Sequence, residues 1–162
     1  MNRRVDQKLH VVRLTLTAIE ALSPEKNPAI ETALVESALF HLHIAYRAYL
    51  HELLLHCKVT VDAETAQQAA DLLRAQQLQN SDIDELAKLE RSGAWPAQLR
   101  TAYADAANHE VRKESASSNG LTLHVGLNLR DVTAHIDDEV LAAWLQQFQL
   151  LLQRQREHAQ EW

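Results

Sequence analysis

Glycine and proline are scarce in this chain of 162 residues, which holds only three of each. Both residues interrupt helices, and tight strand-to-strand turns depend on glycine. Their scarcity therefore favours long helices over a fold rich in strands. The glycines Gly93, Gly120 and Gly126 also stand alone in the sequence. Phosphate-cradling loops need closely spaced glycines, so the common nucleotide-binding loops are excluded.

Cysteines and long apolar runs are missing as well. Cys57 is the single cysteine, so no disulfide can form within the chain, which suits a reducing compartment. No segment approaches the roughly 18 apolar residues that span a bilayer. The N-terminal stretch is typical of an amphipathic helix and not of a signal peptide. We therefore expect a soluble cytoplasmic protein without a membrane segment and without a cofactor.

The charge balance bears on possible partners. The formal net charge is -6, and the basic residues form no continuous stripe. Proteins that bind nucleic acid neutralise phosphates with clustered lysine and arginine, so nucleic acid is an unfavourable partner for this chain. The length and the hydrophobic fraction of 46% are ordinary for one globular domain, and we expect residues 1–162 to form a single domain.

The spacing of the apolar residues predicts an all-α bundle of five to six helices around a long central helix. In the first helix the apolar residues recur at steps of three and four, and they are Val5, Leu9, Val12, Leu16 and Ile19. The expected helices span about 3–22, 28–58, 63–77, 81–92, 95–109 and 137–162. The second is the longest and has apolar residues on several sides, which predicts a central position in the bundle.

The second helix carries one broad apolar stripe. Its predicted members are Val35, Leu39, Leu42, Tyr46, Tyr49, Leu53 and His56, broadened by Phe40, Ile44 and Leu54. Ala38, Ala45 and Ala48 are small, so another helix can approach closely at these positions. We expect several neighbouring helices to pack around this one.

Helix ends and loops follow from local residue chemistry. Asn27 is a good N-cap, and Pro28 fits the first position of the second helix. Asp62 or Thr60 is expected to cap the third helix, and Ser81 with Asp84 to form a capping box for the fourth. Residues 115–120 are predicted to be a loop. Residues 121–129 alternate apolar and polar side chains, so a strand there stays open.

The stretch "RAYLHELLLHC", residues 47–57, resembles the zinc-binding pattern H-E-x-x-H. Two histidines bind one zinc ion from a helix when they are four residues apart and share a face. His51 and His56 are five residues apart, which places them roughly 140° apart around the helix axis. We therefore predict no metal at these histidines. The paired Glu-x-x-His motifs of di-iron bundles are also absent from the sequence.

Nucleophilic catalysis has no support in the motifs. The sequence contains no G-x-S-x-G turn. Cys57 is placed at the end of the second helix, where the negative end of the helix dipole raises a thiol pKa. The interpretation therefore leans away from an enzyme.

Two alternatives remain open. Helical-bundle ribonucleases of the HEPN superfamily carry an arginine followed a few residues later by a histidine, and Arg130 and His135 have that spacing. They are the candidate pair for RNA or nucleotide processing. Tyr49, Glu52 and His56 are candidates for a small-ligand site, with Glu52 and His56 spaced for a hydrogen bond along the helix.

The three tryptophans are interpreted as structural anchors. Trp95 and Trp144 have leucine, alanine and glutamine neighbours, which favours burial in the core over stacking on nucleic-acid bases. Trp162 is expected to pack against the bundle.

Three stretches carry a resemblance to a known family. They are "ESALFHLHIAYRAYLHEL", "DELAKLERSGAWPAQLRTAYADA" and the closing "RQREHAQEW". With them the chain resembles a gammaproteobacterial family of unknown function, DUF6586, over nearly its whole length. The resemblance implies a bacterial cytoplasmic origin and a single domain, and it implies no activity. The leading hypothesis is a non-enzymatic helical module that binds a protein partner or forms a homo-oligomer.

Overall fold

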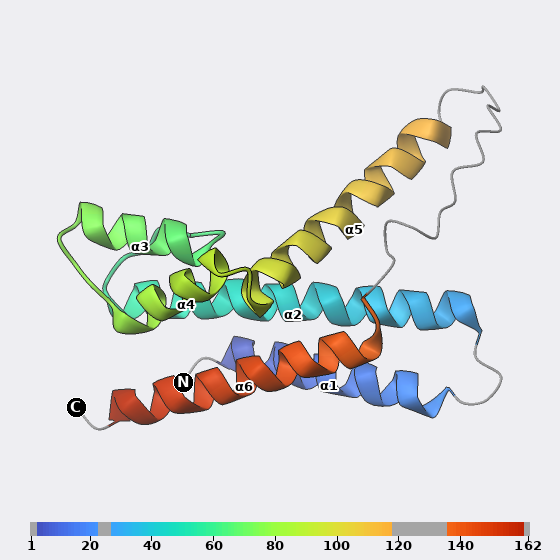
Figure 1. The fold of residues 1–162 in the computed structure, drawn as a ribbon, viewed down its shortest axis with the longest axis horizontal. Coiled ribbons are helices and arrows are strands. Elements are labelled where there is room, and N and C mark those ends of the chain that lie inside the picture. The colour runs from blue at the N-terminus through green and yellow to red at the C-terminus, as the bar shows by residue number, and fades with distance from the viewer. Residues whose placement is uncertain (1–2, 23–26, 118–135, 161–162) are drawn as a thin grey trace.

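The structure is a computed structural model that describes residues 3–22, 27–117 and 136–160, with the backbone alone at 109–117 and 159–160. Figure 1 shows the described part as helices without strands, which confirms the all-α prediction. The helices are α1 (Arg3–Ala21), α2 (Pro28–His56), α3 (Ala66–Ala75), α4 (Ser81–Arg91), α5 (Trp95–Ser117) and α6 (Asp138–Gln160). The open question of a strand at 121–129 falls outside the described residues, as does Trp162.

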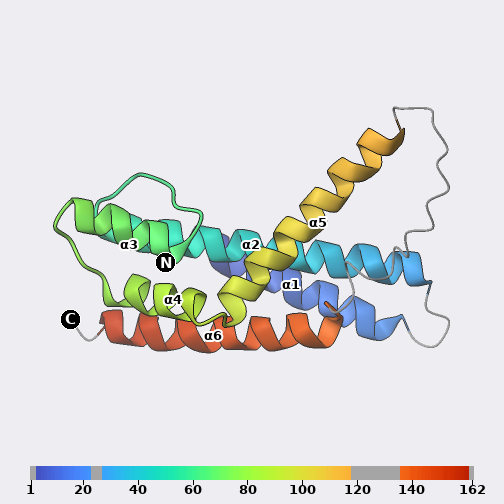
Figure 2. The ribbon, with the colours of Figure 1, turned by 45° about the horizontal axis from the view of Figure 1, so that its top comes forward.

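α1 and α2 form an antiparallel hairpin, and α6 runs beside them with the same direction as α2 (Figures 1 and 2). The apolar stripe predicted for α1 is buried at every position, namely Val5, Leu9, Val12, Leu16 and Ile19. Arg156 Nη1 of α6 lies 2.9 Å from Asp6 Oδ1 of α1, so an ion pair joins the last helix to the first. None of the helices described here has the length and apolarity that a bilayer crossing requires.

α2 begins as the sequence predicts and ends slightly earlier. Asn27 is the N-cap, and its Oδ1 accepts a hydrogen bond of 3.0 Å from Ala29 N. The helix ends at His56, because Lys58 adopts a left-handed backbone with φ of 63°. The Lys58 and Val59 amides then donate to the Leu55 and Leu54 carbonyls, which closes the helix end.

The central position of α2 is confirmed, but its predicted stripe is wrong at two places. Leu39, Leu42, Tyr46, Tyr49 and Leu53 are all buried, and so are Ala38 and Ala45. Phe40 is 46% exposed, and its ring lies beside those of His41 on the same helix and Tyr103 of α5. His56 is exposed because it is the last residue of α2.

The predicted caps of α3 and α4 were wrong, and α3 begins three residues later than the expected position 63. Thr65 caps α3 with its hydroxyl oxygen, which accepts from Gln68 N at 3.0 Å, so neither Thr60 nor Asp62 is the cap. Asn80 caps α4 in place of Ser81, and its Oδ1 accepts from the amides of Asp82 and Ile83. Each stretch contains several residues able to cap, and propensity alone does not choose among them.

α5 continues to Ser117, eight residues beyond the predicted end at His109. The loop predicted at 115–120 is therefore wrong for 115–117, and 118–120 lie outside the described residues. In Figures 1 and 2 the far end of α5 stands away from α2, while its start packs on the bundle.

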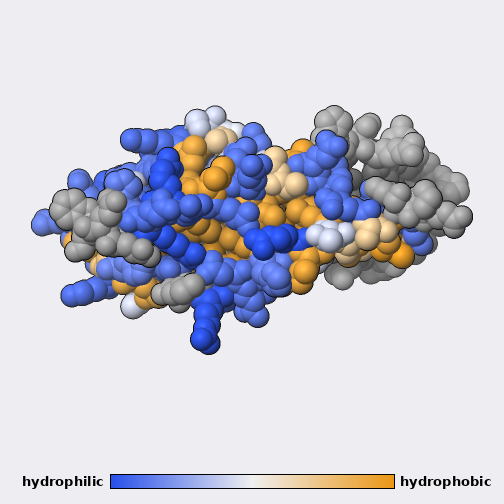
Figure 3. All heavy atoms as spheres, turned by 90° about the horizontal axis from the view of Figure 1, so that it is seen from below, coloured by the Kyte–Doolittle hydropathy of each residue, from blue (hydrophilic) through white to orange (hydrophobic). Residues whose placement is uncertain are grey.

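The core is centred on aromatic rings from three helices. Phe148 of α6 is fully buried and packs 5.1 Å from the Trp95 ring and within 6.1 Å of Tyr46. Trp95 and Trp144 are 5% and 6% exposed, which confirms their predicted role as core anchors. Figure 3 views the face formed by α1 and α6, where apolar side chains gather in a band between polar ones. Leu14 of α1 and Leu150 of α6 are more than half exposed.

Candidate functional site

A large groove lies where the N-terminal half of α2, the middle of α5 and the start of α6 come together. Its volume is about 1180 Å³. The middle of the groove is apolar, with side chains contributed by all three helices and by the residues just before α6. They include Val35, Leu39, Ala102, Ile136, Val140 and Trp144. Three segments far apart in the sequence therefore form one apolar surface.

Trp144 fixes the wall that α6 contributes. Its side chain is almost fully buried, and its Nε1 donates a 3.3 Å hydrogen bond to Gln98 Oε1 of α5. This bond ties α6 to α5 and satisfies the indole N–H at the groove surface. The groove thus has a rigid aromatic side wall.

Acidic residues from the same three regions line the groove. They are Glu31, Glu36, Asp105, Asp137 and Asp138, and within the part of the chain whose side chains the structure describes, no lysine, arginine or histidine lines the groove. Asp137 also caps α6, since its Oδ1 accepts from Val140 N at 2.9 Å. The groove therefore combines an apolar floor with a strongly negative rim.

The three residues of the ligand site predicted from the sequence differ from one another in burial and in bonding. Tyr49 is buried, and its hydroxyl donates to Gln155 Oε1 of α6. Burial raises the pKa of the Tyr49 hydroxyl, and the nearby Asp82 and Glu52 carboxylates raise it further. Glu52 is buried with Oε2 unbonded, whereas His56 is exposed and forms no hydrogen bond with Glu52. A ligand role for these three residues stays a prediction.

A polar network around Tyr49 was not predicted. Gln155 accepts from Tyr49 and donates through Nε2 to Glu85 Oε2 of α4 at 2.9 Å. Arg154 pairs with the same Glu85 carboxylate. Burial raises the pKa of Asp82 on the adjacent turn, and the Glu85 charge adds to the effect. Gln155 lies three residues after Leu152 on the buried stripe of α6, so helical spacing alone was sufficient to identify it.

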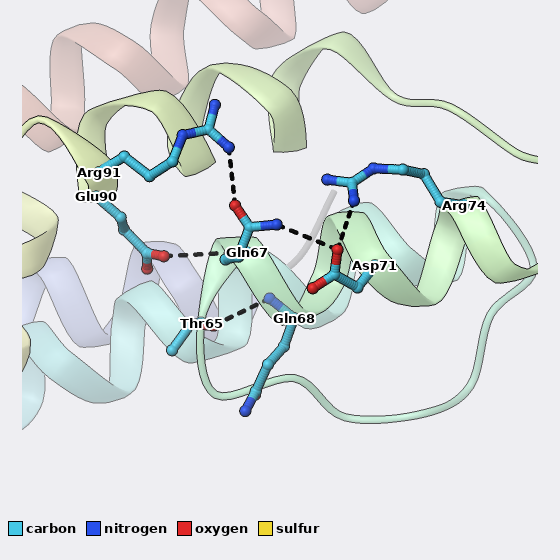
Figure 4. Close-up of polar contacts among 7 residues, drawn as sticks. All are labelled: Thr65, Gln67, Gln68, Asp71, Arg74, Glu90 and Arg91. Atoms are coloured by element: carbon cyan, nitrogen blue, oxygen red, sulfur yellow. Dashed lines mark hydrogen bonds and ion pairs between the residues drawn. The ribbon is translucent and has the colours of Figure 1, made fainter.

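A second network, centred on Glu90 of α4, holds the start of α3 (Figure 4). Glu90 Oε1 accepts from the Tyr46 hydroxyl at 2.8 Å and from Ala66 N at 3.1 Å. Its other oxygen accepts from Gln67 N at 3.3 Å. A carboxylate at a helix N-terminus is stabilised by the unpaired amides and by the helix dipole. Nothing local in the sequence indicated this role, because the partners of Glu90 lie far from it in the chain.

The histidines are dispersed over separate contacts. The His43 ring stacks on Tyr103 of α5 at 3.9 Å with an interplanar angle of 6°. The pKa of His43 is lowered to about 4, mainly by burial and also by the Arg47 and Arg100 charges, while Glu64 opposes them. His51 Nδ1 lies 2.7 Å from Asp62 Oδ1, so it pairs away from the exposed His56. Within the part of the chain that the structure describes, no group of three or more histidine, cysteine or acidic residues is placed to hold a metal ion.

The family assignment rests on the whole length of the chain. The model of DUF6586, described as a family of unknown function, matches residues 1–162. The chain belongs to this family. Searches of curated proteins and of solved structures gave no match. Membership therefore confirms the resemblance seen in the sequence and brings no activity or ligand with it. Arg130 and His135, the pair of the ribonuclease hypothesis, lie outside the described residues, and that hypothesis stays a prediction.

Proposed function

We propose that this chain is a non-enzymatic helical module of the bacterial cytoplasm that holds a segment of a partner protein in the groove between α2, α5 and α6. The observation that supports this is the apolar floor of the groove. Val35, Ile136 and Val140, which come from α2, from the residues just before α6 and from α6, are only partly buried and line the groove beside the buried Leu39. Accessible apolar surface gathered in one place is typical of interaction sites.

The size of the groove favours a polypeptide over a small molecule. Its volume of about 1180 Å³ is above the range of roughly 300–1,000 Å³ usual for small-molecule pockets. Its walls are made of the helices α2, α5 and α6. Grooves of this kind bind the apolar face of a partner helix in many complexes. A protein partner therefore fits the shape better than a compact metabolite does.

Site-specific photo-crosslinking in bacterial cells tests this proposal. The crosslinking residue benzoylphenylalanine replaces Thr101, which is exposed and lines the groove. The same residue at Thr17, exposed on α1 and absent from the groove, is the matched control. We expect a crosslinked partner protein from position 101 and none from position 17, measured by mass shift on a gel and by mass spectrometry.

A second substitution decides whether the groove itself makes the contact. Thr32→Trp places a large ring in the groove from the side of α2 and is expected to remove the crosslink from position 101. Equal crosslinking from both positions, or a crosslink that Thr32→Trp leaves unchanged, would contradict the proposal. A product made only of two copies of this chain would also contradict it, because the contact would then be self-association.

A further inference from the structure

We infer that the segment held in the groove is a cationic amphipathic helix, an inference that rests on the function proposed above. The partner helix would place its apolar stripe on the groove floor and its lysine or arginine residues against the rim. Three properties of the groove lead to this inference: the sign of its charge, the chemistry of its floor, and its volume.

The described side chains that line the groove carry charge of one sign. Five of them are carboxylates, two from α2, one from α5 and two at the start of α6, and none of the described lining residues is basic. A concave surface with charges of one sign and an apolar floor concentrates the electrostatic field and attracts ligands of opposite charge. The same field repels the phosphates of nucleic acids and of anionic lipids. The complementary partner is therefore a basic polypeptide.

The apolar floor favours a helix over an extended peptide. An extended segment must pair its backbone amides and carbonyls, and sheet edges provide such pairs. Here both walls are helices, α2 and α5, whose own backbones are already bonded internally. An extended backbone pressed on Leu39 and Val140 would leave buried polar groups unpaired, which is unfavourable. A helix bonds its own backbone and avoids this loss.

The volume of the groove agrees with a short length of helix. A helix with its side chains is about 10 Å across and rises about 1.5 Å per residue. A cylinder of that diameter with the groove volume of about 1180 Å³ is about 15 Å long, which corresponds to about ten residues. Nearly three helical turns provide three or four apolar side chains on one face, spaced as i, i+3, i+4 and i+7.

Peptide binding measured by fluorescence anisotropy tests the inference. The probe is a fluorescein-labelled peptide of about 18 residues with leucine on one helical face and lysine elsewhere, and a second probe has glutamate at every lysine position. We expect the lysine peptide to bind at least about tenfold more tightly than the glutamate peptide at low salt, with the difference shrinking as salt is added.

Charge-reversed protein variants locate the binding site. Glu36→Lys with Asp105→Lys reverses two rim charges and is expected to raise the Kd of the lysine peptide about tenfold. Glu20→Lys with Asp84→Lys is the matched control: both residues are exposed, and neither lines the groove. Each pair changes the net charge from -6 to -2, since each substitution adds two charges. The control should change the Kd less than about twofold.

The possible outcomes distinguish a failure of this inference from a failure of the proposed function. If both peptides bind equally and Thr32→Trp blocks both, the groove docks helices without selecting charge, and the inference is overturned while the proposed function stands. If the control pair weakens binding as much as the rim pair, net charge alone drives binding, and the inference is again overturned. If neither peptide binds, the inference fails. The crosslinking experiment then tests the proposed function independently.

Discussion

The two halves of α2 differ in what covers them. In the C-terminal half, Tyr46 and Tyr49 bond to side chains of α4 and α6, and Leu50, Leu53 and Leu54 are at most 4% exposed. In the N-terminal half, Ile30 and Phe40 are nearly half exposed, and the side of the helix that carries Val35 and Glu36 lines the groove. One continuous helix therefore acts as a core element at one end and as the wall of an open site at the other.

Polar groups follow the same division. In the covered half, the hydroxyls of Tyr46 and Tyr49 are buried and each donates to a side chain on another helix, Glu90 or Gln155. In the open half, the carboxylate of Glu36 is exposed on the groove rim, where water solvates it. Satisfied buried networks stabilise a fold, whereas solvated charges beside apolar surface are available to a partner.

Truncating a side chain should reveal the largest difference in stability between the covered half and the open half of α2. Phe148→Ala removes a fully buried ring that packs on Tyr46, Tyr49 and Trp95, and it should lower the free energy of unfolding by about 3–5 kcal/mol. Val35→Ala in the groove should cost about 1 kcal/mol or less, because that side is open to water. Urea unfolding measures both. Equal losses would mean that the groove is as well packed as the core.

Removing the charge of Glu90 should have an intermediate effect. Glu90→Gln loses the carboxylate that accepts from the Tyr46 hydroxyl and from the first amides of α3, at an expected cost of about 1–3 kcal/mol. Amide hydrogen exchange at Ala66 and Gln67 should become faster. Glu36→Gln on the groove rim is the control and should leave stability within about 0.5 kcal/mol. A large effect of the control would contradict the division between the two halves.

His43 lies at the α2–α5 crossing and should make stability depend on pH. Its pKa falls from 6.5 to about 4 on folding, so the folded state favours the neutral ring. This contribution is complete above pH 6.5, falls as the pH is lowered, and is lost below about 4. The loss at pH 5 should be about 1–2 kcal/mol. His43→Phe keeps a ring beside Tyr103 and removes the titration, so its unfolding free energy should change less between pH 7 and pH 5 than that of the original chain. An equal change in both proteins would exclude His43 as the source.

The long helices were predictable because their burial pattern is local. Steps of three and four in α1 placed every buried residue correctly, and Asn27 with Pro28 marked the start of α2. Helix starts near several capping residues were less predictable. At α3 the contact that accompanies the Thr65 cap comes from Glu90, on another helix. Tertiary contacts select one cap among several whose local energies are similar.

The groove could not be predicted from any single helix. Its floor combines Leu39, Ala102 and Val140, which belong to three helices, and each fits an ordinary amphipathic pattern within its own helix. The acidic residues of the rim likewise resemble a solvated surface when read along the chain. Only the three-dimensional arrangement shows that they surround one apolar surface. The sequence did identify Tyr49 as a candidate site residue, but the hydrogen bonds that join Tyr49 to Gln155 and Gln155 to Glu85 connect three helices and became visible only in the folded chain.

The contact between Asp6 and Arg156 also has a consequence for the order of folding. α1 and α2 are neighbours in the sequence and can pair as soon as both have left the ribosome, since closing a short loop is fast. The ion pair joins residues 150 positions apart, so it forms only after α6 has been synthesised. Until then, the surface of the hairpin that α6 will cover is exposed to solvent, and a nascent chain stalled before α6 would present it to chaperones.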